Sequence, residues 1–188
     1  MAASASSNGT GIDKLARTLP LYTLAVELTS RCNLRCAYCR HADGSFRGSE
    51  TRQDVLDRAL EIARRYKPHA VSFVGDGEIT ISDGWMDKIA PFLQLPIPVT
   101  CIVTNLQKPF DEEEIEFFSR FRQIIISLDT VDRQTLKEVR VGSDVRNVFY
   151  TLARIRGAAV KRNRPMPGLK IQAVLTNRSA LQALDLAT

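Results

Sequence analysis

Three cysteines stand close together in the stretch CNLRCAYC. They are Cys32, Cys36 and Cys39, so their spacing is C-x-x-x-C-x-x-C. Clustered thiolates are ligands for zinc or iron, whereas disulfides between such near neighbours would constrain little of the chain. Structural zinc sites and ordinary iron–sulfur clusters take four protein ligands, so three thiolates leave one metal position open for water or substrate. The spacing therefore favours an open, catalytic iron site.

A second interpretation stays open for these cysteines. A closed zinc loop needs a fourth ligand, which His41 or Cys101 would supply. Cys101, however, lies inside the apolar run VTCIVT, where a free cysteine is typically a small buried side chain. We therefore carry the open iron site forward, with the zinc loop as its alternative.

Polar residues also follow the later apolar runs of the chain. Ser127 and Asp129 are two residues apart in ISLD, so they lie on one face of an extended segment. The other positions are Gly77 and Glu78 in VGDGEIT, Asn105 in VTNL, Arg140 in VRVG and Asn177 in VLTNRSAL. Each also has an ordinary structural interpretation, as a turn residue, a helix cap or a solvated arginine.

The elements that must position these residues alternate along the chain. Runs rich in β-branched residues predict five strands, at 24–28, 70–75, 99–104, 123–129 and 169–176. Segments of helical period lie between them, at 51–66, 83–93, 111–121 and 144–160. This alternation predicts an α/β fold whose parallel strands curl into a partial barrel through right-handed crossovers. The carboxyl ends of the strands then share one rim, where we expect the chemistry.

The helices carry their own sequence signals. The first long helix is predicted to begin at the capping residue Thr51, with Asp54 three positions on, and to place Val55, Ala59 and Ile62 on one face. Segment 111–121 concentrates acids in its first turn, where they complement the helix dipole.

The composition suits one globular domain. The 188 residues are 44% hydrophobic, and the excess of 26 Lys and Arg over 21 Asp and Glu is too weak to indicate a nucleic-acid partner, although it leaves RNA open. We expect residues 1–20 to form a disordered or extended tail and residues 21–188 to form the barrel. No signal peptide or membrane-spanning run is found. The protein is therefore predicted to be cytoplasmic, in a reducing compartment.

One edge of the predicted sheet is incomplete. Beyond the fifth strand, the sequence NRSALQALDLAT has room for one helix and no sixth strand. Strand 169–176 would then be an exposed parallel edge. We expect either that further residues complete the sheet or that a partner covers it.

The stretch CNLRCAYC resembles the cluster-binding motif of the radical S-adenosylmethionine (SAM) enzymes, including the aromatic Tyr38 before the last cysteine. The resemblance implies a 4Fe-4S cluster on Cys32, Cys36 and Cys39, with SAM on the fourth iron. Reduction of the cluster then cleaves SAM to methionine and a 5′-deoxyadenosyl radical, which removes hydrogen from a substrate. It also implies an external low-potential electron donor of the flavodoxin or ferredoxin type, and a core of six β/α units, of which about five are present.

The same resemblance assigns the remaining polar residues to the SAM pocket. Gly77 and Glu78 match the family's Gly-Gly-Glu segment, with Asp76 and Ile79 departing from it. Asn105 matches a Thr-Asn-Gly segment whose glycine is replaced by Leu106. Ser127 and Asp129 are implied to lie at the SAM ribose and Arg140 at the SAM carboxylate, and Tyr38 and Asn177 are further positions implied to bind the cofactor. Cys101 becomes a hydrogen donor only if it faces the barrel interior.

The substrate is not readable from these residues. Members of the family act on peptides, sugars or aminoglycosides, small metabolites and RNA. A different class also remains: a non-catalytic zinc or iron–sulfur interaction module that a partner chain completes.

Overall fold

The computed structural model describes residues 20–180 of the chain. Five parallel strands form one sheet, in the order β1-β3-β4-β5-β7. Their bounds are β1 Thr23–Val26, β3 Ala70–Phe73, β4 Val99–Thr104, β5 Gln123–Ser127 and β7 Gly168–Gln172. The five predicted strands and their parallel pairing are thus confirmed, each within a few residues of its expected bounds. The predicted tail lies almost wholly outside the described residues, as does most of the segment 177–188 for which one helix was predicted.

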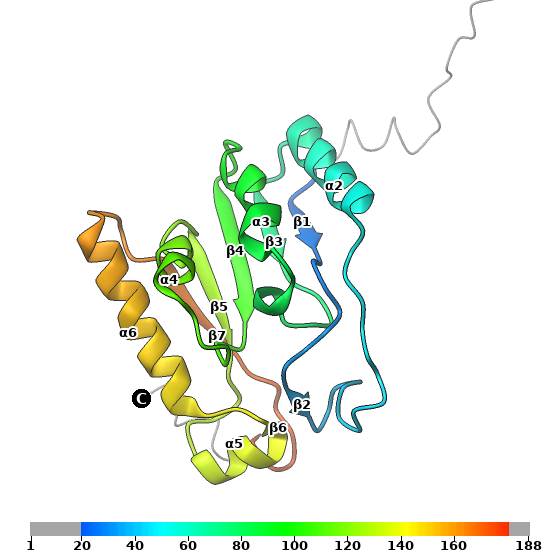
Figure 1. Ribbon diagram of the computed structural model, residues 1–188, viewed down its shortest axis with the longest axis vertical. Helices are drawn as coiled ribbons and strands as arrows, with labels where there is room; N and C mark the ends of the chain where they lie inside the picture. The colour runs from blue at the N-terminus through cyan, green and yellow to red at the C-terminus, as the bar shows by residue number, and fades with distance from the viewer. Residues whose placement is uncertain (1–19, 181–188) are drawn as a thin grey trace, which may run out of the picture.

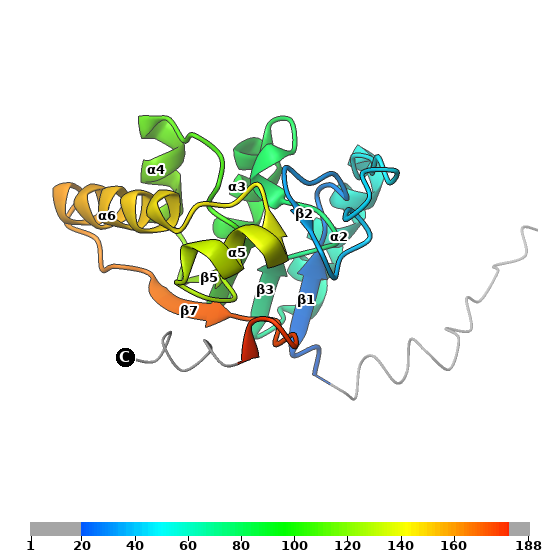
Figure 2. The same cartoon turned by 90° about the horizontal axis from the view of Figure 1, so that it is seen from below.

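Helices connect successive strands and cover one face of the sheet (Figures 1 and 2). They are α2 Gln53–Tyr66, α3 Trp85–Leu93, α4 Glu112–Phe118 and α6 Val145–Lys161, and these four confirm the predicted helical segments. Of the helices in the described residues, none combines the length and apolar character needed to span a bilayer.

The hydrophobic core lies between the sheet and these helices. Alternate strand residues point into it, among them Phe73, Ile102 and Ile124, which are fully buried. Phe73 packs edge-on against Phe92 of α3 at 5.4 Å between ring centroids. The large apolar side chains therefore fix the helices on this face.

The opposite face of the sheet is left uncovered by these helices, and we call it the open face. One row of paired residues crosses it, consisting of Ala25, Ser72, Cys101, Gln123 and Gly168. Cys101 itself is buried among its neighbours, and its thiol donates to the carbonyl of Val71 at 3.6 Å. Cys101 therefore lies on the sheet face opposite the helices, as its role as a hydrogen donor requires. The role itself stays a prediction.

The first long helix differs from its prediction in two details. Thr51 is not its cap, because α2 begins after Arg52, which makes no side-chain capping bond. The amide of Thr51 instead donates to the carbonyl of Leu28 at 2.8 Å. Of the predicted face, Val55 is wrong because it is 49% exposed, whereas Ala59 does pack against the core. The buried face is Leu56, Ala59, Leu60 and Ala63, which is the i, i+3, i+4, i+7 pattern of an amphipathic helix.

Two features at the carboxyl end of the sheet were not predicted. A short helix, α5 Arg133–Val139, follows β5, and a two-stranded antiparallel ribbon pairs β2 Arg35–Cys36 with β6 Arg140–Val141. In the ribbon, Cys36 lies opposite Arg140. In Figure 1, α5, β6 and β2 all lie at the lower end of the sheet. The ribbon therefore joins the segment that carries Cys32, Cys36 and Cys39, which we call the cysteine loop, to a segment about a hundred residues later.

Candidate cofactor site at the carboxyl ends of the strands

The three clustered cysteines lie beyond the carboxyl end of β1. Cys32 precedes β2, Cys36 is its second residue, and the amide of Cys39 donates to the carbonyl of Cys36 at 2.9 Å. All three thiols are free, with Cys36 buried and the other two half-buried. Burial, together with nearby charges that include Cys36 and Cys39, raises the pKa of Cys32 to about 11. The Cys32 thiol therefore stays protonated at neutral pH until a metal ion displaces the proton.

Glu50 anchors the cysteine loop to a neighbouring segment of the chain. Its carboxylate accepts hydrogen bonds from Arg31 at 2.6 Å, Ser82 at 2.5 Å and Lys88 at 2.7 Å. Burial opposes ionisation of Glu50, but these hydrogen bonds prevail and lower its pKa to about 2. A charged Glu50 therefore ties the cysteine loop to the start of α3 at all ordinary pH values.

Gly77 lies in close contact with the cysteine loop. A Cβ atom at this position would lie 2.2 Å from the carbonyl oxygen of Arg31, so only glycine fits. The next amide, that of Glu78, donates to the same oxygen at 2.8 Å. Gly77 thus permits the GDGE turn to pack on the cysteine loop, and its implied contact with SAM stays a prediction.

Glu78 is buried and connects two strand ends. Its carboxylate accepts from the hydroxyls of Thr80 and Thr104, each at 2.7 Å, and from the amide of Asn105 at 2.7 Å. Burial raises the pKa of Glu78, while these hydrogen bonds act against the rise. The Asn105 side chain in turn donates to the Asn33 side chain at 2.8 Å, within the cysteine motif.

Asp129 is the centre of a second network. Its carboxylate accepts from Tyr38 at 2.6 Å, from Arg140 at 2.9 and 3.0 Å, and from the amide of Val174 at 2.8 Å. Arg140 also points a guanidinium nitrogen at the sulfur of Cys36, 3.9 Å away. Burial and the hydrogen bond to Asp129 raise the pKa of Tyr38. The network therefore connects the middle cysteine to the ends of β5 and β7.

These contacts settle several structural alternatives. Arg140 is not a solvated loop arginine, since it is 7% exposed and paired with Asp129. Asp129 does not cap the next helix, because Asp132 caps α5. Asn177 is exposed in the turn after β7, where the hydroxyl of Thr176 makes the capping contact with the amide of Ser179 at 3.2 Å.

The predicted residues therefore form one connected rim, with Asn177 at its margin. Ser127 is the last residue of β5 and half-buried. Residues missed from the sequence are Asn33, Glu50, Thr80 and Thr104. The start of α5 could have been predicted from Asp132, which is a typical capping residue. Its carboxylate accepts a hydrogen bond from the amide of Thr135, three positions later, at 2.8 Å. The two-residue strands β2 and β6 are too short to show a periodic pattern.

The donor set fits an iron–sulfur cluster. Each thiolate of such a cluster binds a different iron, so the three thiols need not converge on one ion. Within residues 20–180, no group of three or more His, Cys, Asp or Glu side chains is placed to hold a single metal ion. His41, the possible zinc ligand, is buried against Phe46, 5.0 Å away between ring centroids.

Comparison with known families decides the classification. The model of the radical SAM superfamily matches residues 26–172. The chain belongs to the radical SAM superfamily. Its members use a 4Fe-4S cluster and SAM, and they generally need an electron from an external donor. The superfamily assignment accounts for three cysteines at the rim of a parallel α/β sheet.

Among curated relatives, a probable GTP 3′,8-cyclase of Pyrococcus abyssi is 33% identical over 138 residues, which are 71% of this chain and 42% of that protein. A GTP 3′,8-cyclase of Clostridium perfringens is 28% identical over 144 residues, or 74% and 44% of the two chains. The chain therefore spans less than half the length of these relatives.

Solved radical SAM structures share the fold. Streptococcus suis SuiB bound to S-adenosylmethionine aligns with a TM-score of 0.70 at 20% identity, over 94% of this chain and 40% of that one. Methylornithine synthase aligns with a TM-score of 0.67 at 9% identity, over 89% and 50% of the chains. At these identities the likeness concerns the fold alone.

Proposed function

We propose that this radical SAM chain cleaves SAM reductively and uses the resulting radical to abstract hydrogen from a substrate. The observation that carries the proposal is that the segment with three free thiols is bonded to the strand ends, at Asn33 through Asn105 and at Cys36 through Arg140 and Asp129. Bound cluster and SAM supply the radical chemistry: methionine and a 5′-deoxyadenosyl radical form from SAM and one electron. The protein supplies ligands, orientation and exclusion of water.

The residues divide this work by position. Cys32, Cys36 and Cys39 hold the cluster and leave its fourth iron for SAM. Arg140 and Asp129 form a buried pair that fixes Cys36 and Tyr38, so we assign them first to positioning the cluster. The backbone at Gly77 and the side chains of Tyr38, Asn105, Ser127 and Asn177 remain the proposed SAM contacts, with Glu78 shaping the loop that carries Asn105.

The test replaces Cys36 with alanine in the full chain. After anaerobic reconstitution with iron and sulfide, wild-type protein should be brown and should release 5′-deoxyadenosine when dithionite and SAM are added. Cys36→Ala should lose both the colour and the product. Cys101→Ala is the matched control for iron content, and it should keep its iron because Cys101 lies inside β4, away from the carboxyl-end rim that carries the other three cysteines.

Two results would overturn the proposal. Wild-type protein that is colourless and holds one zinc ion would favour the zinc module. A stable cluster with no SAM cleavage, together with tight association with another chain, would favour the interaction module completed by a partner.

For the substrate, we propose a small metabolite and place GTP first, because the curated relatives reported above are named GTP 3′,8-cyclases. The match covers less than half of each of those proteins, so their name supports the choice without excluding peptides, sugars or RNA. The test is 5′-deoxyadenosine formation with GTP, a peptide, an aminoglycoside and RNA. GTP should raise the rate of 5′-deoxyadenosine formation above the rate measured without substrate.

The electron donor and location belong to the same proposal. A flavodoxin or ferredoxin would supply the low-potential electron, and a reducing cytoplasm would suit free thiols. Reduced flavodoxin should replace dithionite in the assay, and failure of both protein donors would contradict this part.

A further inference from the structure

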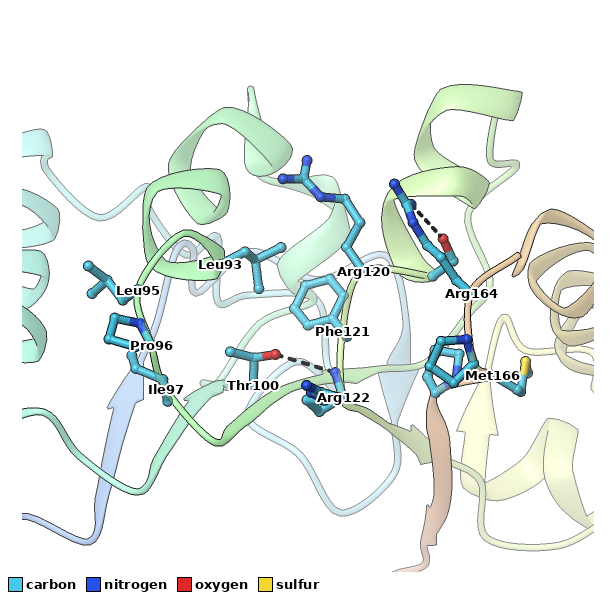
Figure 3. Close-up of a pocket in the computed structure, with 13 residues that line it drawn as sticks. Leu93, Leu95, Pro96, Ile97, Thr100, Arg120, Phe121, Arg122, Arg164 and Met166 are labelled. Carbon is cyan, nitrogen blue, oxygen red and sulfur yellow. Dashed lines mark hydrogen bonds between the residues drawn. The ribbon is translucent and has the colours of Figure 1, made fainter. Parts of the chain in front are cut away.

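A cavity lies at the end of the sheet opposite the cysteines, at the amino ends of β4, β5 and β7. Its volume is about 530 Å³, which is ample for a small ligand. Figure 3 shows Leu93, Leu95 and Ile97 along one wall, and Arg164 and Met166 on the other. Phe121 lies between them. The strands are five or six residues long, so this cavity is about 15–20 Å from the cysteine rim.

The cavity is lined by three arginines and by no acidic residue. The arginines are Arg120, Arg122 and Arg164, and all three are exposed. Within the part of the chain that the structure describes, none of them forms an ion pair with a carboxylate. This distinguishes them from Arg140, Arg154 and Arg162, which are paired with Asp129, Glu112 and Glu116. The lining therefore concentrates three positive charges beside an apolar wall.

A side-chain hydrogen bond and the local backbone together hold Arg164 in place. Arg164 donates to the hydroxyl of Ser119 at 3.1 Å, and Ser119 is itself buried. Asn163, with φ of 50°, turns the chain out of α6 just before it. Pro165 and Pro167 then restrict the backbone of the segment that leads into β7. Arg164 is thus presented by a constrained segment rather than by a free loop.

A neighbouring acid does not neutralise the cavity. Glu116 is bound by Arg162 at 2.6 Å. This hydrogen bond, followed by the charges of Arg162, Arg164 and Lys161, lowers the pKa of Glu116. The carboxylate of Glu116, which senses Arg164, is therefore already bound by another arginine, and positive charge remains in excess.

We propose that this cavity binds a small phosphate-bearing molecule. Guanidinium groups bind phosphate oxygens through paired N–H donors, and three of them match a diphosphate better than a single charge. The apolar wall would contact the organic part of the ligand. Because the cavity is at the end of the sheet remote from the cysteines, we assign it a role distinct from the radical chemistry, such as binding an effector.

The test is calorimetric titration of the full chain with inorganic pyrophosphate. Arg122→Ala and Arg164→Ala should each weaken binding about fivefold to tenfold, and raised salt should weaken it further. Arg156→Ala is the matched control, since Arg156 is exposed on α6 outside the cavity, and it should change affinity less than twofold. Hydrogen exchange should slow at residues 119–123 and 164–168 when pyrophosphate binds.

Three results would overturn the inference: no saturable binding of pyrophosphate, equal weakening by Arg156→Ala, or citrate binding as tightly as pyrophosphate at matched ionic strength. Cys36→Ala separates this inference from the proposed function. That variant should lose SAM cleavage and still bind pyrophosphate, so failure of one proposal leaves the other testable.

Discussion

Arg140 is the side chain that most directly connects the cysteine motif to the rest of the rim. It pairs with buried Asp129 and reaches the sulfur of Cys36, while the β2–β6 ribbon holds its backbone opposite that cysteine. A lysine would keep the charge but lose the fork that binds Asp129 through two nitrogens.

We therefore predict that Arg140→Lys lowers the affinity of the protein for its cluster about tenfold and shifts the cluster's reduction potential. Iron content after reconstitution and a redox titration followed by absorbance would measure both. Arg133→Lys, on the exposed start of α5, serves as the control and should behave as wild type. Wild-type iron content and potential in Arg140→Lys would refute the positioning role.

Leu106 adopts a left-handed conformation, with φ of 54°, at the position where the superfamily motif has glycine. Its side chain is fully buried in the core. The packing of the side chain thus offsets the cost of the backbone conformation, which is about 1 kcal/mol.

Consequently, Leu106→Ala should lower the free energy of unfolding by about 2–5 kcal/mol, because packing is lost while the strain remains. Leu106→Gly should be more stable than Leu106→Ala by about 1 kcal/mol, since glycine accepts this φ. At Leu56, inside α2, the order should reverse, with glycine about 1 kcal/mol worse than alanine. Urea unfolding of the four variants measures both differences in stability. If alanine and glycine rank in the same order at both sites, the backbone of Leu106 is not strained.

At the scale of elements, Glu50 joins the cysteine loop, α3 and the segment before α2. Its pKa is lowered to about 2, so the charged form contributes stability above its ordinary value of 4.5. This contribution is lost as the pH falls from 4.5 through about 2, where the folded form also becomes protonated.

We predict that Glu50→Gln destabilises the cluster-free protein by about 1 kcal/mol at pH 7, a value that allows for partial solvent screening. The difference from wild type should shrink as the pH falls from 4.5 toward 2.5. Glu61→Gln, in the exposed pair with Arg58, should change stability by less than about 0.5 kcal/mol. Denaturant unfolding at several pH values would test this, and a difference independent of pH would exclude the charged network as its cause.

At the scale of the whole molecule, the sheet has an uncovered edge at β7. Within residues 20–180, β7 pairs only with β5, and Leu169 and Ile171 are 45% and 49% exposed. An apolar edge strand of this kind pairs readily with other strands.

We therefore expect the chain to self-associate as its concentration rises, and Ile171→Lys to shift it toward the monomer. Val160→Lys adds the same charge at an exposed apolar residue of α6, away from the edge, and should leave association unchanged. Sedimentation velocity over a range of concentrations would distinguish these cases. A wild-type chain that stays monomeric throughout would show that the edge is protected.

Local patterns were enough to predict much of this molecule. The alternation of β-branched runs with helical periods determined the parallel α/β sheet, because each period reflects which faces of an element are buried. The cysteine spacing determined the superfamily, since a three-thiolate ligand set is unusual and contiguous. Boundaries were less certain, and the buried face of α2 was assigned only in part, because Leu56 and Ala63, rather than Val55, join Ala59 at the core.

The pairings across the rim were decided only by the tertiary structure. From the sequence, Asp129 and Arg140 were separate ligands for SAM, yet in the fold they bind each other. That contact depends on a ribbon of two-residue strands, and such strands have no sequence period. The arginine cavity likewise gathers three segments that lie far apart in the chain. The sequence by itself specified which residues are chemically able to act, and long-range packing decided which of them meet.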